Sequence, residues 1–182
     1  MSHAKPAHIV CAVEPNEEAN DVVSIAAHLA QREGCDLTLI HVVPPMWQPY
    51  ADLNFTPIVE AQVAVEEDLL NTAKQKLNEL AEAAGGGATV VVEKGDPASG
   101  IVNHANALDG AMIVIGVHNR HGLKRLLGST AHGVLNNTEL PILLVHADEH
   151  ETSQYDNVVV ALDTSPSLSE VLDPAMPYIQ HA

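Results

Sequence analysis

The chain has 182 residues, which is enough for one full domain and a remainder but not for two full domains. Apolar residues make up 46% of it and aromatic residues 3%, so it can bury an aliphatic core but offers few rings on which single-stranded nucleic acid would stack. The 24 acidic and 8 basic residues give a net charge of -16, which repels a phosphate backbone, so we expect no nucleic-acid partner.

Five short apolar runs alternate with segments whose apolar residues recur at helical spacing. The runs predict strands that are covered on both faces, and the helical spacing predicts helices with one inner face. The predicted strands, in chain order, are 8–14, 37–43, 88–94, 111–116 and 141–145. The predicted helices are a first one that contains 22–30 and ends at Gly34, then 59–84, 96–108 and one within 123–137.

This alternation predicts an α/β fold. Each strand–helix–strand unit makes a right-handed crossover between parallel strands, so we expect an open parallel sheet with helices on both faces. Ligands in such sheets bind beyond the carboxyl ends of the strands, at the point where the strand order reverses.

Two features surround the long predicted helix. Its residues on or near the inner face are expected to be Val63, Leu70, Leu77 and Leu80. The preceding segment 46–57 shows no periodicity and is predicted to be a loop, whose three aromatic residues would either form a lid or fill a gap.

The chain is predicted to divide into one complete domain and the start of a second. Residues 1–146 hold all five predicted strands, and the acidic, polar segment 147–156 is interpreted as a linker. The run 157–163 repeats the opening run 8–14, with Asp163 equivalent to Glu14. Residues 157–182 are therefore predicted to be the truncated start of a second repeat.

Cysteine usage and hydropathy predict a cytoplasmic protein. Cys11 and Cys35 are too few for a disulfide scaffold and are expected to be free thiols. The chain has no apolar stretch of membrane-spanning length and no signal-peptide core at its start, so no membrane association is expected. The acidic residues fit both a halophilic surface and ordinary acidic solubility.

Glycine and serine gather where the fourth predicted strand gives way to a helix. Residues 116–122 leave the strand, and residues 128–130 open the helix. Glycine backbone amides together with a helix N-terminus make a cradle for phosphate, although turns and helix caps use the same residue types. Arg120, Lys124 and Arg125 place three of the 8 basic residues in this segment, which favours phosphate.

Catalytic and metal-binding patterns are weak. The chain has no Walker-type phosphate loop and no glycine-rich dinucleotide fingerprint after the first strand. Ser129 lacks a nucleophile context and is interpreted as a helix-cap residue. His118, His121 and His132 invite a metal interpretation, yet their spacing does not resemble a zinc site, and we expect them to be loop and surface residues. No catalytic residue and no metal site are predicted.

An ordered combination of motifs resembles the universal stress protein family over residues 7–146. The motifs are the opening Val-Ala-Val-Glu strand that ends at Glu14, the turn 95–97, an Ile-Val-Ile strand, and Gly116 and Asn119 followed after eight residues by Gly128 and Ser129. The resemblance implies a five-stranded parallel sheet of order 3-2-1-4-5 and a homodimer formed through the fifth strand. It also implies bound ATP or another adenine nucleotide in many members, and the truncated repeat is similar to tandem members.

The resemblance also implies which residues bind the nucleotide. Glu14 takes the place of the acid that meets the ribose or a metal, such as magnesium, on the phosphates. The backbone near Val42 takes the place of the adenine-contacting strand end. The phosphate loop falls on Gly116, Asn119, Arg120, Gly128, Ser129 and Thr130.

Two departures from the family pattern leave two functions open. Nucleotide-binding members usually carry Asp in place of Glu14 and Gly in place of Asn119, with nine residues before the later glycine. One function is a stress-response sensor that holds ATP and signals through dimer or partner contacts, with slow hydrolysis as its only chemistry. The other is a nucleotide-free dimeric interaction module of the same fold. An adenylate-forming enzyme is disfavoured because its glycine-rich loop would occupy the first turn, which here is Glu14-Pro15-Asn16.

Overall fold

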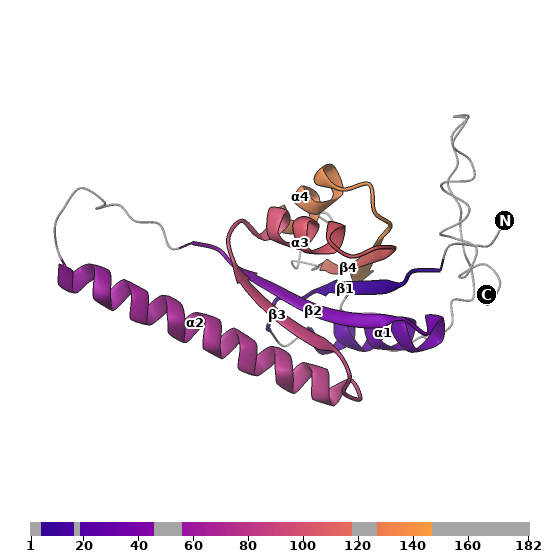
Figure 1. Ribbon diagram of the computed structural model, residues 1–182, viewed down its shortest axis with the longest axis horizontal. Coiled ribbons are helices and arrows are strands. Elements are labelled where there is room, and N and C mark those ends of the chain that lie inside the picture. Colours follow the sequence, from indigo (N-terminus) through magenta and orange to yellow (C-terminus); the bar gives the residue numbers. More distant parts are fainter. Residues whose placement is uncertain (1–4, 17–18, 46–55, 118–126, 147–182) are drawn as a thin grey trace, which may run out of the picture.

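The computed structural model describes residues 5–16, 19–45, 56–117 and 127–146, in which strands and helices alternate (Figure 1). The strands are β1 (His8–Ala12), β2 (Asp36–Val43), β3 (Thr89–Lys94), β4 (Ala111–Val117) and β5 (Ile142–His146). The helices are α1 (Ala19–Glu33), α2 (Thr56–Ala83), α3 (Pro97–Asn106) and α4 (Ser129–Asn137). The predicted linker 147–156 and repeat 157–182 lie outside the described residues.

The five strands form one parallel sheet of order β3-β2-β1-β4-β5, which confirms the expected topology. β1 is central: Cys11 lies beside Leu39 of β2 on one side and beside Val114 of β4 on the other. The chain builds outward from β1 to β3 and then crosses over to β4 and β5. The strand order therefore reverses between β1 and β4, and their carboxyl ends define the position where such sheets bind ligands.

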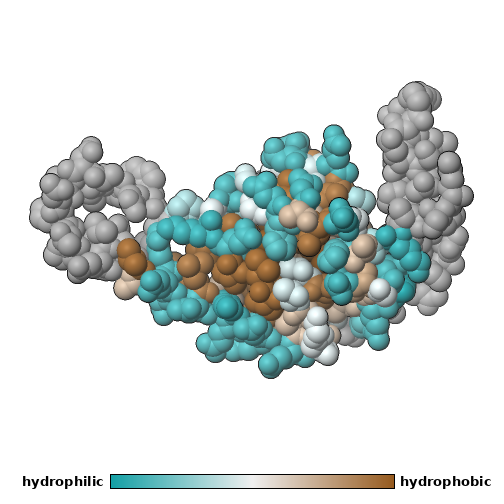
Figure 2. All heavy atoms as spheres, viewed as in Figure 1, coloured by the Kyte–Doolittle hydropathy of each residue, from teal (hydrophilic) through white to brown (hydrophobic). Residues whose placement is uncertain are grey.

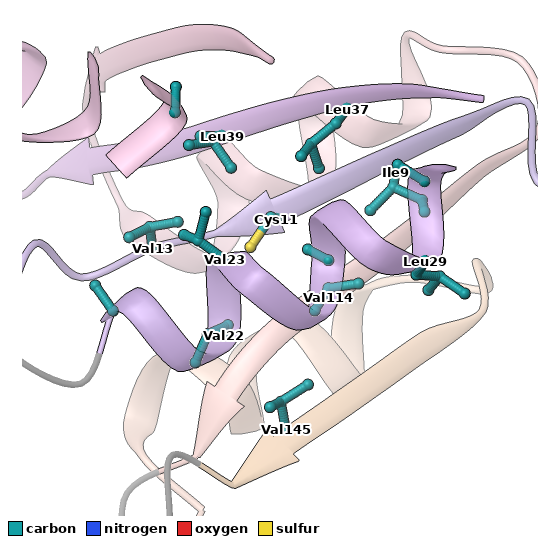
Figure 3. Packing of buried hydrophobic residues seen from close by; sticks show 14 of the residues in the cluster. Ile9, Cys11, Val13, Val22, Val23, Leu29, Leu37, Leu39, Val114 and Val145 are labelled. Atoms are coloured by element: carbon teal, nitrogen blue, oxygen red, sulfur yellow. The ribbon is translucent and has the colours of Figure 1, made fainter. Parts of the chain in front are cut away.

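Two aliphatic cores cover the two faces of the sheet. On one face, Ile9, Cys11 and Val13 pack in a cluster with buried residues of α1 and α2, and Figure 3 shows Cys11 beside Val23 of α1. On the other face, Val10 and Ala12 pack with buried residues of α3 and α4. Because successive side chains of β1 enter opposite cores, the strand is apolar from Ile9 to Ala12, as the continuous run in the sequence predicted.

The inward residues Ile101, Val102 and Ala105 of α3 are buried, as expected. The prediction for α2 is correct for Leu77, which is fully buried, but wrong for Val63, which is 49% exposed. Figure 1 shows the reason, because the first turns of α2 run out beyond the sheet, before the helix reaches the end of β3 at Glu66.

Three predicted boundaries differ from the observed ones by two residues or more. One of them is the end of α3, which lies at Asn106 rather than at residue 108. The first strand ends at Ala12 rather than at Glu14. The long helix starts at Thr56, three residues before the predicted start, and includes Pro57. Proline is tolerated in the first turn of a helix, because the amide hydrogen that it lacks has no partner there.

The edge strand β3 is only partly covered. Its Val90, Val91 and Val92 are half-buried. Figure 2 shows hydrophobic atoms gathered where β3 lies between α2 and α3, with hydrophilic residues over much of α2. At the carboxyl end of β3, Lys94 forms an ion pair with Glu66, which ties α2 to the sheet edge.

The cap of α3 supports a prediction on pH. Asp96 Oδ1 accepts hydrogen bonds from the Ser99 hydroxyl at 2.6 Å and from the Ser99 amide at 2.9 Å. The bond from the hydroxyl, and then that from the amide, lowers the pKa of Asp96 below its ordinary value of 3.8. A lowered pKa in the folded state means that this stabilisation is present above 3.8 and is lost as the pH falls through the folded value. We expect Asp96→Ala to destabilise the protein near neutral pH and to approach the wild type as the pH falls below 3.8.

Urea unfolding at several pH values measures this effect. Asp96→Asn is the matched control, because asparagine keeps an oxygen acceptor at the cap but does not titrate. A gap between wild type and Asp96→Ala that stays constant through the acidic range would contradict the cap assignment.

The two cysteines are free thiols with different burial. Burial raises the pKa of the Cys11 thiol to about 12. Burial, and then the charges of Glu33 and Asp36, raise the pKa of Cys35. We expect an alkylating reagent to modify Cys35 slowly in the folded protein and Cys11 only after unfolding, because the thiolate is the reactive form. Peptide mapping after timed labelling measures both, and equal labelling of the two in the folded state would disprove the expectation.

Candidate functional site

The carboxyl edge of the sheet brings several predicted residues together. Ala12 lies beside Ile115, so Glu14 follows the end of β1 next to the end of β4, where Gly116 lies. Val42 occupies the end of β2 on the other side of β1. The helix α4 follows β4 in the chain and starts at Ser129. A helix that joins parallel strands starts at the carboxyl edge, so the segment 128–130 belongs to the same edge.

Glu14 sits at the start of a tight turn. The Val13 amide donates to the Ile40 carbonyl at 2.9 Å, and this is the last backbone hydrogen bond between β1 and β2. The Asn16 amide then donates to the Glu14 carbonyl at 2.8 Å, and the Ala19 amide donates to the Asn16 carbonyl at 3.2 Å. Glu14 itself is exposed. Its place after β1 puts Glu14 at the switch point.

The backbone at Val42 is held firmly by its own side chain. Val42 is buried in the core with Ile101 and Val102 of α3. A Cβ on Gly100 would lie 2.9 Å from Val42 Cγ2, so α3 crosses β2 at close range because residue 100 has no side chain. A base placed at this strand end would meet a rigid peptide unit.

Gly116 and Gly128, which the sequence analysis placed in one phosphate loop, have different reasons to be glycine. A Cβ on Gly116 would lie 2.9 Å from Val22 Cγ2, so Gly116 allows α1 to pack on the end of β4. Gly128 has φ -60° and ψ 158°, which any residue adopts, and a Cβ there would have no described atom within 4 Å. Among the described residues no close contact requires glycine at position 128, where glycine serves as the N-cap of α4.

The first amides of α4 have no hydrogen-bond acceptor inside the helix. Gly128 caps the helix without a side-chain hydrogen bond, and the first helical bond runs from the His132 amide to the Gly128 carbonyl at 2.9 Å. The amides of the first turn, at Ser129 and Thr130, precede that bond and have no acceptor inside the helix. Gly128 and Ser129 are exposed and Thr130 is partly so. This geometry suits an anion.

Several predicted residues lie outside the described ranges. They are Asn119 and Arg120 of the predicted phosphate loop, Lys124 and Arg125 beside it, and His118 and His121. Across the described ranges, no group of three or more histidine, cysteine, aspartate or glutamate residues is placed to hold a metal ion. A search of those same ranges finds no helix with the length and apolarity to span a bilayer.

His41 was not predicted as a site residue. Its Nδ1 lies 2.8 Å from the Val13 carbonyl oxygen, on the neighbouring strand just before Glu14. The only signal in the sequence is a polar ring in the apolar strand 37–43. That signal is weak, because the partner becomes visible only once the register of the two strands is known.

The fold and the carboxyl edge of its sheet together define an open α/β protein whose strand order reverses between β1 and β4. The chain belongs to the universal stress protein family, whose model matches residues 6–146. Universal stress protein A homolog 2 of Coxiella burnetii is 31% identical over 146 residues, which cover 80% of this chain and 97% of that protein. Universal stress protein YxiE of Bacillus subtilis is 27% identical over 145 residues, which cover 75% of this chain and 97% of that protein.

Solved structures share the fold. Hypothetical protein MJ0577 superposes with a TM-score of 0.62 at 20% identity, over 78% of this chain and 96% of that one. A universal stress protein in complex with cAMP superposes with a TM-score of 0.53 at 20% identity, over 79% of this chain and 98% of that one. The Archaeoglobus fulgidus universal stress protein in complex with dAMP superposes with a TM-score of 0.50 at 23% identity, over 77% of this chain and 98% of that one.

Proposed function

We propose that this protein binds an adenine nucleotide across the carboxyl ends of β1 and β4. The observation that carries the proposal is the exposed start of α4, where Gly128 caps the helix without a side-chain hydrogen bond and the first-turn amides have no acceptor inside the helix. Two universal stress proteins of the same fold were solved in complex with cAMP and with dAMP. These complexes support an adenine nucleotide as the ligand class.

In this proposal each part of the nucleotide has a partner of matching chemistry. The phosphates lie on the amides of 128–130, and the positive charge of Arg120 attracts them. The base lies against the peptide unit of Val42. The ribose, or a magnesium ion on the phosphates, faces the carboxylate of Glu14. ATP is the nucleotide that we propose, and binding with slow hydrolysis at most makes the protein a sensor in the stress response rather than an enzyme.

Calorimetry with ATP, AMP and cAMP, with and without magnesium, tests the proposal. Gentle purification followed by mass spectrometry adds an independent test, because a bound adenine nucleotide would co-purify. GTP is the control for the base. Absence of heat, of a thermal shift and of co-purified nucleotide at millimolar ATP with magnesium would overturn the proposal and favour the nucleotide-free interaction module.

We propose further that signalling runs through a homodimer formed at the edge strand β5. The residues Ile142, Leu143 and Leu144 of β5 are only half-buried, and Leu135 of the adjoining α4 is 41% exposed. Within the described residues no strand pairs with the outer edge of β5. An apolar edge strand pairs readily with another strand, and a second copy of the chain offers the same edge. Sedimentation at tens of micromolar protein tests this, and a monomer at that concentration would count against it.

A further inference from the structure

The pairing between β1 and β2 stops one step earlier than the strands allow. In a parallel ladder, a residue donates to one residue of its neighbour and accepts from the residue two positions further on. The Val13 amide donates to the Ile40 carbonyl at 2.9 Å. The next hydrogen bond would run from the Val42 amide to the Val13 carbonyl. Pairing instead ends with Ala12 beside Ile40.

The side chain of His41 takes the place of that missing hydrogen bond. Its Nδ1 lies 2.8 Å from the Val13 carbonyl oxygen. A carbonyl oxygen only accepts hydrogen bonds, so Nδ1 carries the hydrogen and the imidazole donates. The His41 side chain of β2 thus binds the Val13 carbonyl, which the backbone amide of Val42 in β2 would otherwise bind.

The missing hydrogen bond affects the backbone amide and carbonyl of Val42. Along β2 the backbone groups of alternate residues face opposite neighbours: the Ile40 carbonyl accepts from β1, and the Val43 carbonyl accepts from Gly95 after β3 at 3.0 Å. The amide and carbonyl of Val42 therefore face the β1 side, where within the described chain the ladder has already ended. They open onto the switch point beside Glu14.

An open amide and carbonyl on one residue match the edge of adenine. The base offers a ring nitrogen that accepts and an exocyclic amino group that donates. Hypoxanthine exchanges both characters, since its ring nitrogen donates and its exocyclic oxygen accepts. A rigid site with one donor and one acceptor therefore discriminates between the two bases.

We propose that His41 is a positioning residue for base recognition: by holding the Val13 carbonyl out of the ladder, it keeps the amide and carbonyl of Val42 free for the purine. The base-recognition part rests on the nucleotide function proposed above. The effect on the ladder does not, and it is measurable without any ligand.

The ligand-free experiment is amide hydrogen exchange by NMR on the full chain. We expect the Val42 amide to exchange quickly in the wild type. In His41→Leu the Val13 carbonyl is released to the ladder, and we expect Val42 exchange to slow by about tenfold or more. His41→Asn keeps an N–H donor near the position of Nδ1 and is expected to behave like the wild type. Long-range proton–nitrogen spectra of the wild type are expected to show the Nδ1–H tautomer.

The second experiment compares ATP with ITP by calorimetry. We expect the wild type to prefer ATP, and His41→Leu to lose about tenfold in ATP affinity while its preference for ATP over ITP collapses. His41→Asn is expected to retain the preference, which a role in general stability would not predict. His28→Leu, an exposed histidine on α1, is the control and should change neither quantity.

The outcomes separate the two proposals. If the wild type binds no nucleotide but Val42 exchange slows in His41→Leu, the nucleotide function fails and the effect of His41 on the ladder stands. If the wild type binds ATP and His41→Leu changes neither Val42 exchange nor the ATP preference, the inference on His41 is overturned. If His41→Leu does not fold, a wild-type imidazole protonated only at Nε2 would overturn it equally.

Discussion

Replacing Leu77 with alanine is expected to lower the free energy of unfolding by about 2–5 kcal/mol, the range observed when a buried leucine leaves a cavity. Leu77 lies in α2 and is 0% exposed. The other buried residues of this helix among those with described side chains are Ala73 and Ala81, which are small. One leucine thus provides the largest fully buried contact of α2 with the sheet. The loss is a large part of the roughly 5–15 kcal/mol that stabilises a typical domain.

Leu69→Ala is the matched control for that prediction. It makes the same chemical change in the same helix, but Leu69 is 44% exposed. We expect its effect to stay within about 0.5 kcal/mol, as for ordinary surface substitutions. Urea unfolding measures both variants, with an unchanged denaturant dependence as the sign that the unfolded states are comparable. Similar losses for the two variants would show that α2 is not anchored by Leu77.

The difference between Leu77 and Val63 shows what periodicity predicts and what it does not. Both residues belong to one helical pattern, and that pattern correctly predicted a long helix with an inner face. Periodicity does not reveal where the sheet ends, because the width of a sheet depends on how many strands lie under the helix. α2 is longer than the region of the sheet it covers, so the same pattern is buried at Leu77 and exposed at Val63.

The candidate site was likewise predictable from the sequence only in part. The strand order and the positions of Glu14, Val42 and Gly128 at one edge follow from the order of elements and from the family resemblance. The role of His41 does not, because it depends on a side chain that reaches the neighbouring strand, and the register between those strands is a property of the folded sheet. The two glycines Gly116 and Gly128 are alike in sequence terms, and only the position of Val22 distinguishes them.

Gly128→Val is expected to weaken ATP binding by at least about tenfold, or 1.4 kcal/mol. It is expected to lower the free energy of unfolding by no more than about 1 kcal/mol, because valine is a poorer helix N-cap residue than glycine. The residue has φ -60° and ψ 158°, an extended conformation that valine adopts readily, and the added side chain meets no described atom within 4 Å. Any loss of affinity therefore comes from side-chain atoms that stand between the ligand and the amides of α4, and not from a distorted loop. Calorimetry with ATP and thermal unfolding on the same samples measure the two effects.

Gly133→Val is the control that makes this result specific. Gly133 lies in the same helix, but a Cβ there would be 2.6 Å from Ala98 Cβ, so the crossing of α3 and α4 must open to admit a side chain. We expect this variant to melt at a lower temperature, since overpacking a close contact typically costs about 1–3 kcal/mol. Loss of ATP affinity in Gly128→Val with no more than the small loss of stability expected from the helix cap, beside a larger loss of stability in Gly133→Val, assigns the N-terminus of α4 to the ligand. An unstable Gly128→Val variant, or one that binds ATP as the wild type does, would show instead that this glycine serves the fold or serves no ligand.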